Sequence, residues 1–242
     1  MRALFDGVSP SLRFSLDGDP RVLVLLREVL AVSGCFWYLG CKGAGKTTRA
    51  YRELAEEVAA SGRPALILDM QDRMGDVADV ARQESVEGVL RELYVYERHV
   101  MINPTTEDAR ALLRAVLESG DVAVMVDEAG SLCDGRAIAE ELDLLMRNTR
   151  KGVSLRLTSQ RLGDLHQNAF ATADRILVYR LQASADLDRA ERAFGLDRAR
   201  VAALPQFECI EVPMGFQKVV PDDGSPQEAG ESAESLPPSA GA

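Results

Sequence analysis

The stretch that decides the fold is Tyr38-Leu39-Gly40-Cys41-Lys42-Gly43-Ala44-Gly45-Lys46-Thr47-Thr48. It has the spacing of a phosphate-binding P-loop, in which four residues separate a first glycine from Gly-Lys-Thr. Residues 35–39 before it are apolar and predict a buried strand, and helical periodicity begins directly after it. Strand, glycine loop and helix in this order are the context that the motif requires. The stretch therefore predicts a site for the phosphates of a nucleotide.

The chemistry of such a loop explains its residue types. Glycines allow backbone turns that other residues avoid, so that successive N–H groups converge on one anion, and the following helix adds its positive end. We expect Lys46 to reach the β- and γ-phosphates and the Thr47 hydroxyl to hold Mg²⁺. The expected nucleotide-binding residues are Gly40, Cys41, Lys42, Gly43, Ala44, Gly45, Lys46, Thr47 and Thr48.

A second motif lies further along the chain, where the apolar residues 122–126 are followed by Asp127 and Glu128. A buried strand that ends in acids is typical of a Walker B motif, although alone it would more often be an ordinary strand end. The preceding P-loop favours the Walker B interpretation. We expect Asp127 to hold Mg²⁺ through water and Glu128 to polarise the attacking water, because one carboxylate cannot perform both tasks.

A third group of polar residues, Thr158, Ser159 and Gln160, ends the strand expected at 153–160. A side-chain amide at this point could bond both the γ-phosphate and the attacking water, so Gln160 is a candidate sensor of the nucleotide. Asp69 follows the strand expected at 65–68, where it could contact a ligand or simply form a turn. The sequence leaves these two roles of Asp69 open.

Composition limits the class of protein. The chain has 242 residues, 46% of them hydrophobic and 27% charged, as expected of a soluble globular protein. No apolar run is long enough for a membrane span, the N-terminus lacks a signal-peptide layout, and the four cysteines show no metal-ligand or disulfide spacing. These features predict an intracellular protein with reduced thiols.

Alternating strand and helix patterns predict one α/β domain at 21–220 with a mostly parallel central sheet flanked by helices. Residues 1–20 are expected to form an N-terminal extension, and 221–242 a flexible, disordered acidic tail. The tail holds five acids and no Lys or Arg, so the net charge of −10 falls to −5 for the rest of the chain. The other strands are expected at 12–16, 100–103, 174–181 and 207–213 with a return through 215–220. The helices are expected at 21–32, 51–61, parts of 71–97, 105–120, 138–151, 185–194 and 196–204.

Together with these motifs, two further blocks carry a family resemblance. One is Met146-Arg147-Asn148-Thr149-Arg150-Lys151-Gly152 with Leu157-Thr158-Ser159-Gln160-Arg161 after it, and the other is the strand at 171–178. Over residues 33–182 the sequence resembles the HerA/FtsK superfamily of ring-forming, DNA-pumping ATPases. The resemblance implies a RecA-like (ASCE) P-loop NTPase fold. It also implies that Arg147 or Arg150 is an arginine finger for the neighbouring subunit and that Gln160 is the sensor glutamine. The alternative for the two arginines is that they complement the dipole at the C-terminal end of their helix.

Two positions depart from the family pattern. Leu162 stands where the family often has proline, which leaves the geometry of the following loop open, and Arg156 places a charge within an apolar strand that the sequence does not explain. Arg156, Lys151 and Arg161 are candidates for DNA contact, although a structural or surface role is more usual for each.

The short chain most resembles the genome-packaging ATPases of tailless, membrane-containing viruses. By analogy it would use ATP and Mg²⁺ to drive double-stranded DNA into a capsid, as a pentameric or hexameric ring in the host cytoplasm or on the virion, with a capsid vertex or membrane protein as a possible partner. The alternatives are a conjugation or filamentous-phage assembly ATPase, and a non-motor nucleotide switch. The pair Glu128 and Gln160 disfavours the switch, which needs no water-activating carboxylate.

Overall fold

The computed structural model describes residues 33–72, 80–95, 99–133, 137–149 and 152–212. Several expected features lie outside these residues: the strand at 12–16, the helix at 21–32, the return at 215–220, the acidic tail, Arg150 and Lys151. None of the described helices is long and apolar enough to cross a membrane.

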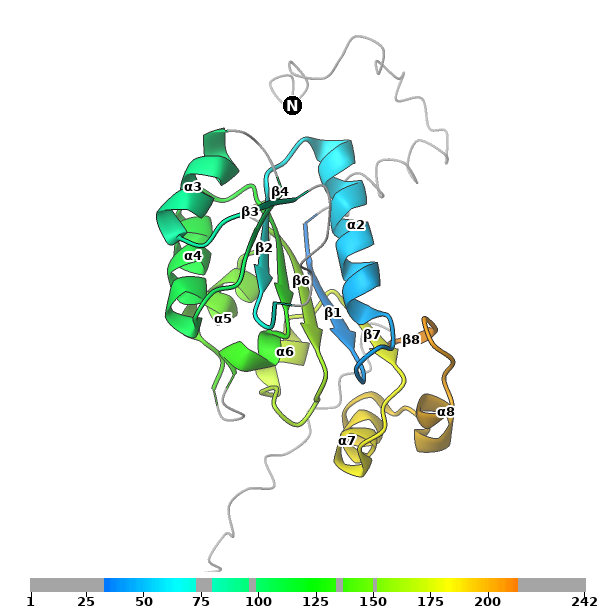
Figure 1. Ribbon diagram of the computed structural model, residues 1–242. Coiled ribbons are helices and arrows are strands. Elements are labelled where there is room, and N and C mark those ends of the chain that lie inside the picture. Colours follow the sequence, from blue (N-terminus) through cyan, green and yellow to red (C-terminus); the bar gives the residue numbers. More distant parts are fainter. Residues whose placement is uncertain (1–32, 73–79, 96–98, 134–136, 150–151, 213–242) are drawn as a thin grey trace, which may run out of the picture.

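The described residues form strands that alternate with helices, as the sequence predicts (Figure 1). The strands are β1 (Cys35–Leu39), β2 (Ala65–Asp69), β3 (Val80–Arg82), β4 (His99–Ile102), β5 (Ala123–Asp127), β6 (Ser154–Ser159), β7 (Arg175–Tyr179) and β8 (Cys209–Val212). The helices are α2 (Lys46–Ser61), α3 (Val86–Val95), α4 (Thr106–Ser119), the short 3₁₀ helix η3 (Ala129–Leu132), α5 (Glu140–Arg147), α6 (Asn168–Ala171), α7 (Ser184–Phe194) and α8 (Arg198–Ala202).

All eight strands join one sheet in the order β3-β4-β2-β5-β6-β1-β7-β8. Every pairing is parallel except that of β7 with β8, so the expectation of a mostly parallel sheet is confirmed. Strand β6 lies between the P-loop strand β1 and the Walker B strand β5. Because parallel strands end at the same edge of the sheet, this order brings the carboxyl end of β6 between the two nucleotide motifs.

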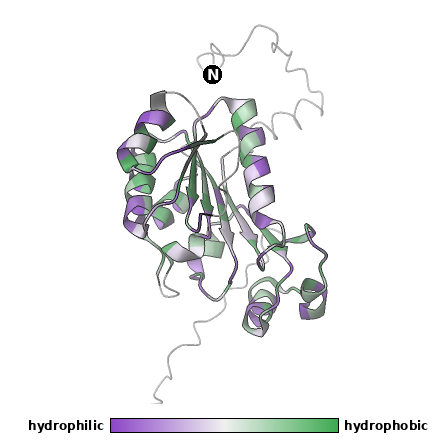
Figure 2. Ribbon diagram, in the orientation of Figure 1, coloured by the Kyte–Doolittle hydropathy of each residue, from purple (hydrophilic) through white to green (hydrophobic). Residues whose placement is uncertain are grey.

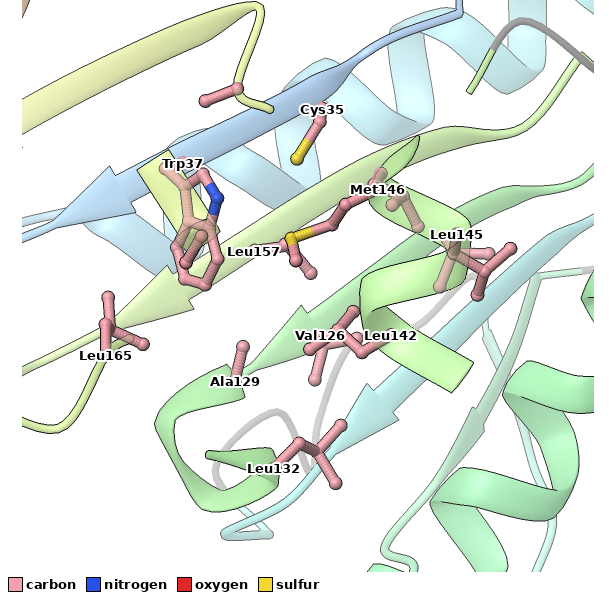
Figure 3. Close-up of a cluster of buried hydrophobic side chains, with 14 of the residues drawn as sticks. Cys35, Trp37, Val126, Ala129, Leu132, Leu142, Leu145, Met146, Leu157 and Leu165 are labelled. Carbon is pink, nitrogen blue, oxygen red and sulfur yellow. The ribbon is translucent and has the colours of Figure 1, made fainter. Parts of the chain in front are cut away.

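The sheet has an apolar core on each face, since successive side chains of a strand point to opposite faces. In β1, Trp37 and Leu39 belong to the larger core and Tyr38 to the smaller one, which α2 covers. Figure 3 shows part of the larger core, where the α5 side chains Leu142, Leu145 and Met146 lie between that helix and the strands. Figure 2 shows mainly hydrophobic strands and helices of mixed hydropathy, as expected for a sheet enclosed by amphipathic helices.

The smaller core contains a buried ion pair that explains the charge at Arg156. Arg156 lies on the α2 face of β6 and is 6% exposed. Its Nη1 donates to Glu57 Oε2 at 2.5 Å and to Ser154 Oγ at 2.9 Å, its Nη2 donates to the Glu53 carbonyl at 3.2 Å, and its guanidinium lies 5.4 Å from the centre of the Phe36 ring. The guanidinium therefore ties β6 to α2, and its burial excludes it as a surface contact for DNA.

Most expected elements occur within a few residues of their predicted bounds. A capping box begins α4, where the Asp108 N–H donates to Thr105 Oγ1 and the Thr105 N–H donates to Asp108 Oδ2, each at 3.2 Å. The sequence did not indicate β3, η3 or α6. These elements have three or four residues each, too few for a period of 2 or 3.6 to become recognisable.

Candidate active site

The P-loop runs from the end of β1 into the first turn of α2, and two of its glycines are required by close packing. Gly45 has a φ of 107°, and a Cβ there would lie 2.5 Å from Cδ1 of Phe207. A Cβ on Gly40 would lie 2.7 Å from the Cβ of Tyr179 in β7. Neither distance is compatible with a side chain. Glycine at these positions therefore lets β7 and the segment before β8 approach the loop.

Hydrogen bonds anchor the start of the loop to its neighbouring strands. The Gly40 N–H donates to the Ser159 carbonyl at 3.1 Å, and the Cys41 N–H donates to the Arg180 carbonyl at 2.8 Å. Lys46 Nζ donates to the Cys41 carbonyl at 3.0 Å. The N–H groups of Gly40 and Cys41 are thus used to hold the loop, whereas later residues of the P-loop line a pocket.

The expected metal ligands Thr47 and Asp127 are in direct contact. The Thr47 hydroxyl donates to Asp127 Oδ1 at 2.7 Å, and the Thr158 hydroxyl donates to the same oxygen at 2.7 Å. Side chains alternate between the two faces of a sheet, and Asp127 and Thr158 both point to the face on which α2 begins. This shared face brings them together with Thr47, which lies in the first turn of α2. A hydroxyl beside a carboxylate is a donor set that suits Mg²⁺, which takes few protein oxygens together with phosphate oxygens and water. Thr47 and Asp127 would hold the ion.

Glu128 turns away from the course of β5, since its φ of 61° is in the left-handed region. Its N–H donates to Thr158 Oγ1 at 2.9 Å, and its Oε1 accepts a hydrogen bond from the Gln160 N–H at 2.9 Å. An unusual backbone conformation of a bulky residue is often found at functional sites. Here it directs the second carboxylate to the end of β6 and separates its environment from that of Asp127.

These residues surround a pocket of about 310 Å³. Its lining consists of Lys42, Gly43, Gly45, Lys46, Thr47, Thr48, Asp127, Glu128, Thr158, Gln160, Gln206 and Phe207. The structure therefore brings together most of the residues expected from the P-loop, the Walker B strand and the sensor. Thr158 was noted in the sequence only as a strand end, and its link to both acids required the fold. Gln206 and Phe207 were not anticipated, because an isolated Gln-Phe pair carries no recognisable motif.

Among the described candidate residues for the nucleotide site, five are not part of this lining: Gly40, Cys41 and Ala44 of the P-loop, Asp69 and Arg147. Asp69 is buried, and its Oδ1 accepts a hydrogen bond from the Gln71 N–H at 3.3 Å, the contact expected of a turn-forming aspartate. Arg147 ends α5, and its Nε lies 3.0 Å from Asp143 Oδ2. Because α5 leads into the start of β6, Arg147 lies toward the amino ends of the strands, whereas the pocket is at their carboxyl ends.

The loop after the sensor strand is held by α7. Asp186 Oδ1 accepts a hydrogen bond from the Gly163 N–H at 3.1 Å, and Arg189 donates to the carbonyls of Gly163, at 3.1 Å, and Leu165. Leu162, at the position noted above as a departure from the HerA/FtsK pattern, is fully buried in the larger core. Core packing and these bonds from α7 fix the loop without a proline.

Comparisons with known proteins show similarity in fold to solved structures, but no similarity in sequence to a known family. No family model and no curated protein sequence matches the chain. Among solved structures, the genome-packaging NTPase B204 from Sulfolobus turreted icosahedral virus 2, in complex with ATP-gammaS, has a TM-score of 0.64 and 17% identity over 77% of this chain and 95% of that one. The bacterial conjugative coupling protein TrwB has a TM-score of 0.53 and 10% identity over 76% of this chain and 85% of that one.

These likenesses agree with the strand order, the P-loop between β1 and α2 and the acids after β5. The chain therefore has a RecA-like P-loop NTPase fold.

Proposed function

We propose that this protein is an ATPase that assembles into a ring and translocates double-stranded DNA, and that it packages a viral genome into a preformed capsid. The observation that carries the proposal is the separation of two carboxylates in one pocket, with Asp127 beside Thr47 and Glu128 beside Gln160. A hydrolase needs one carboxylate at the metal and another at the water. A fold shared with a viral genome-packaging NTPase supports the choice of a packaging motor.

Each residue has a distinct task in this proposal. Backbone N–H groups of the P-loop and Lys46 hold the triphosphate, and Thr47 and Asp127 hold Mg²⁺, which offsets negative charge on the phosphates. Glu128 orients and deprotonates the attacking water, while the Gln160 amide detects the γ-phosphate. Thr158 links the tasks, because its hydroxyl contacts both Asp127 and the Glu128 N–H.

The test is ATP hydrolysis with Mg²⁺, measured with and without duplex DNA. We expect duplex DNA to stimulate turnover in a salt-dependent and largely sequence-independent way, because the motor would contact phosphates rather than base edges. Glu128→Gln should retain ATP binding and lower hydrolysis by roughly 100- to 10,000-fold, the usual contribution of a general base. Glu56→Gln is the matched control, since Glu56 is exposed on α2 and paired only with Arg52 at 3.8 Å among its described ion pairs.

The alternatives predict other results. A non-motor switch would bind ATP without stimulation by duplex DNA, and undiminished hydrolysis by Glu128→Gln would contradict the assignment of the base. A conjugative motor, favoured by the likeness to a conjugative coupling protein, would also be stimulated by duplex DNA. It would differ in its partner, which is a membrane protein in that case and a capsid vertex in the packaging case. Co-purification of the protein with capsids would support the packaging motor, whereas co-purification with a membrane protein in the absence of capsids would support the conjugative motor.

A further inference from the structure

Phe207 is an exposed aromatic residue held in an unusual backbone conformation at the pocket. Its side chain is 61% exposed, and among the described residues the other large exposed hydrophobic side chain is Leu144, at 40%. Its φ of 69° lies in the left-handed region, which bulky residues rarely adopt. Neither the exposure of the ring nor the left-handed backbone adds to the stability of the folded chain. We therefore look for their role in the pocket that Phe207 lines.

The segment that carries Phe207 is fastened directly to the P-loop. The Phe207 N–H donates to the Ala44 carbonyl at 2.9 Å, and Gln206 Nε2 donates to the Gly43 carbonyl at 3.0 Å. The ring lies against Gly45, where a Cβ would be 2.5 Å from its Cδ1. These bonds use carbonyl groups of the loop rather than its N–H groups. The ring is therefore placed by the same residues that would hold the nucleotide.

A nucleotide has an end that the P-loop does not accommodate. Its base is flat and aromatic, and its apolar faces are poorly matched to the polar side chains Lys42, Thr47, Glu128 and Gln160 that line the rest of the pocket. Phe207 supplies the one aromatic surface among the pocket residues. Base–aromatic stacking strengthens binding roughly 5- to 150-fold and accepts every base, because each base has a π-face.

We propose that Phe207 is the base platform of the nucleotide site, on which the base of the bound nucleoside triphosphate stacks, and that Gln206 fixes the platform to the P-loop. This inference rests on the proposed nucleotide binding and adds the element that recognises the nucleoside end. Because stacking does not distinguish purines, the platform by itself gives ATP and GTP similar gains in affinity.

The test compares a ligand that has a base with one that lacks it. Dissociation constants for ATP, GTP and inorganic tripolyphosphate, each with Mg²⁺, are measured by titration calorimetry on the full chain. Phe207→Ala should weaken both nucleotides by roughly 5- to 150-fold and leave tripolyphosphate within twofold, whereas Phe207→Trp should retain nucleotide affinity. Leu144→Ala is the matched control, because it removes an exposed apolar side chain from α5 and should change none of the three constants.

Three results would overturn the platform. Unchanged nucleotide affinity in Phe207→Ala would mean that the ring does not touch the base. An equal loss for tripolyphosphate would mean that Phe207 only shapes the loop, and tighter binding would mean that the ring occupies the site. Failure of the wild-type chain to bind tripolyphosphate and ATP would instead contradict the proposed function, and the platform with it. Unfolding curves of each variant exclude a folding defect.

Discussion

At the scale of single residues, Arg156 illustrates how a charge can be required inside a sheet. The side chains of Arg156 and Glu57 are 7% and 3% exposed, and they share Ser154 as a hydrogen-bond partner. Two buried charges in contact offset much of each other's desolvation, so the pair as a whole adds little net stability. Loss of Arg156 is different, because the Glu57 carboxylate then stays buried with only the more distant Arg63, whose Nη1 lies 3.7 Å from Oε1, as a charged partner.

We therefore expect Arg156→Met to lower the free energy of unfolding by about 3–5 kcal/mol, the usual effect of breaking a buried ion pair. The double variant Glu57→Met with Arg156→Met should recover most of this loss, because it leaves no unpaired charge. Urea denaturation followed by circular dichroism measures both. Arg52→Met is the control, since its surface pair with Glu56 should contribute at most about 1 kcal/mol. Equal losses in the single and double variants would contradict this account.

At the scale of elements, α5 is fastened to α4 by one acid and two bases. Glu141 is 3% exposed at its side chain, and its carboxylate accepts hydrogen bonds from Arg110, whose Nε lies 2.8 Å from Oε2, and from Arg114. The hydrogen bond from Arg110, opposed in part by burial, lowers the pKa of Glu141 from 4.5 to about 2. The link fixes the helix that ends in Arg147.

A lowered pKa makes this link sensitive to acid. The folded chain holds the Glu141 proton less tightly than the unfolded chain, so its contribution to stability is present above pH 4.5 and is lost as pH falls toward about 2. Glu141→Gln should be less stable than wild type at pH 7, and the difference should shrink across this window. Denaturation midpoints at several pH values provide the measurement. Glu118→Gln, an exposed change on α4, should show no such trend, and a constant deficit in Glu141→Gln would contradict the linkage.

At the scale of the whole molecule, the location of Arg147 constrains how it could act in catalysis. Its side chain is 53% exposed and paired with Asp143 on the same helix, near the amino ends of the strands. The pocket is at the carboxyl ends of the strands, so Arg147 is not placed to contact a nucleotide bound to its own chain. A role as arginine finger would require a second copy of the chain, as in the proposed ring.

Mixed assemblies test this arrangement. We expect Arg147→Ala subunits, added to wild type in increasing fractions, to depress ATP hydrolysis by more than simple dilution, because each altered subunit would disable the site of its neighbour. Arg52→Ala, which removes an exposed charge from α2, should leave hydrolysis unchanged. A loss strictly proportional to the fraction of Arg147→Ala subunits would contradict action across an interface.

The sequence by itself determined the parts of this protein that depend on neighbouring residues. Glycine spacing before Lys46 indicated the P-loop, periodicity indicated its flanking elements, and an apolar run indicated the strand that ends at Asp127. Local conformational preferences and period-2 or period-3.6 burial act over a few residues, so they leave a readable pattern. Elements of three or four residues, such as β3, left none.

The tertiary structure alone decided which distant residues meet. The insertion of β6 between β1 and β5 brings Thr158 to Asp127 and Glu128, and the antiparallel strand β8 brings Phe207 to Gly45. The charge of Arg156 within an apolar strand is likewise explained only by its contact with Glu57 in the folded chain. Such contacts depend on strand order and on how helices cover the sheet, which arise from the packing of the whole chain and leave no periodic signal in any one segment.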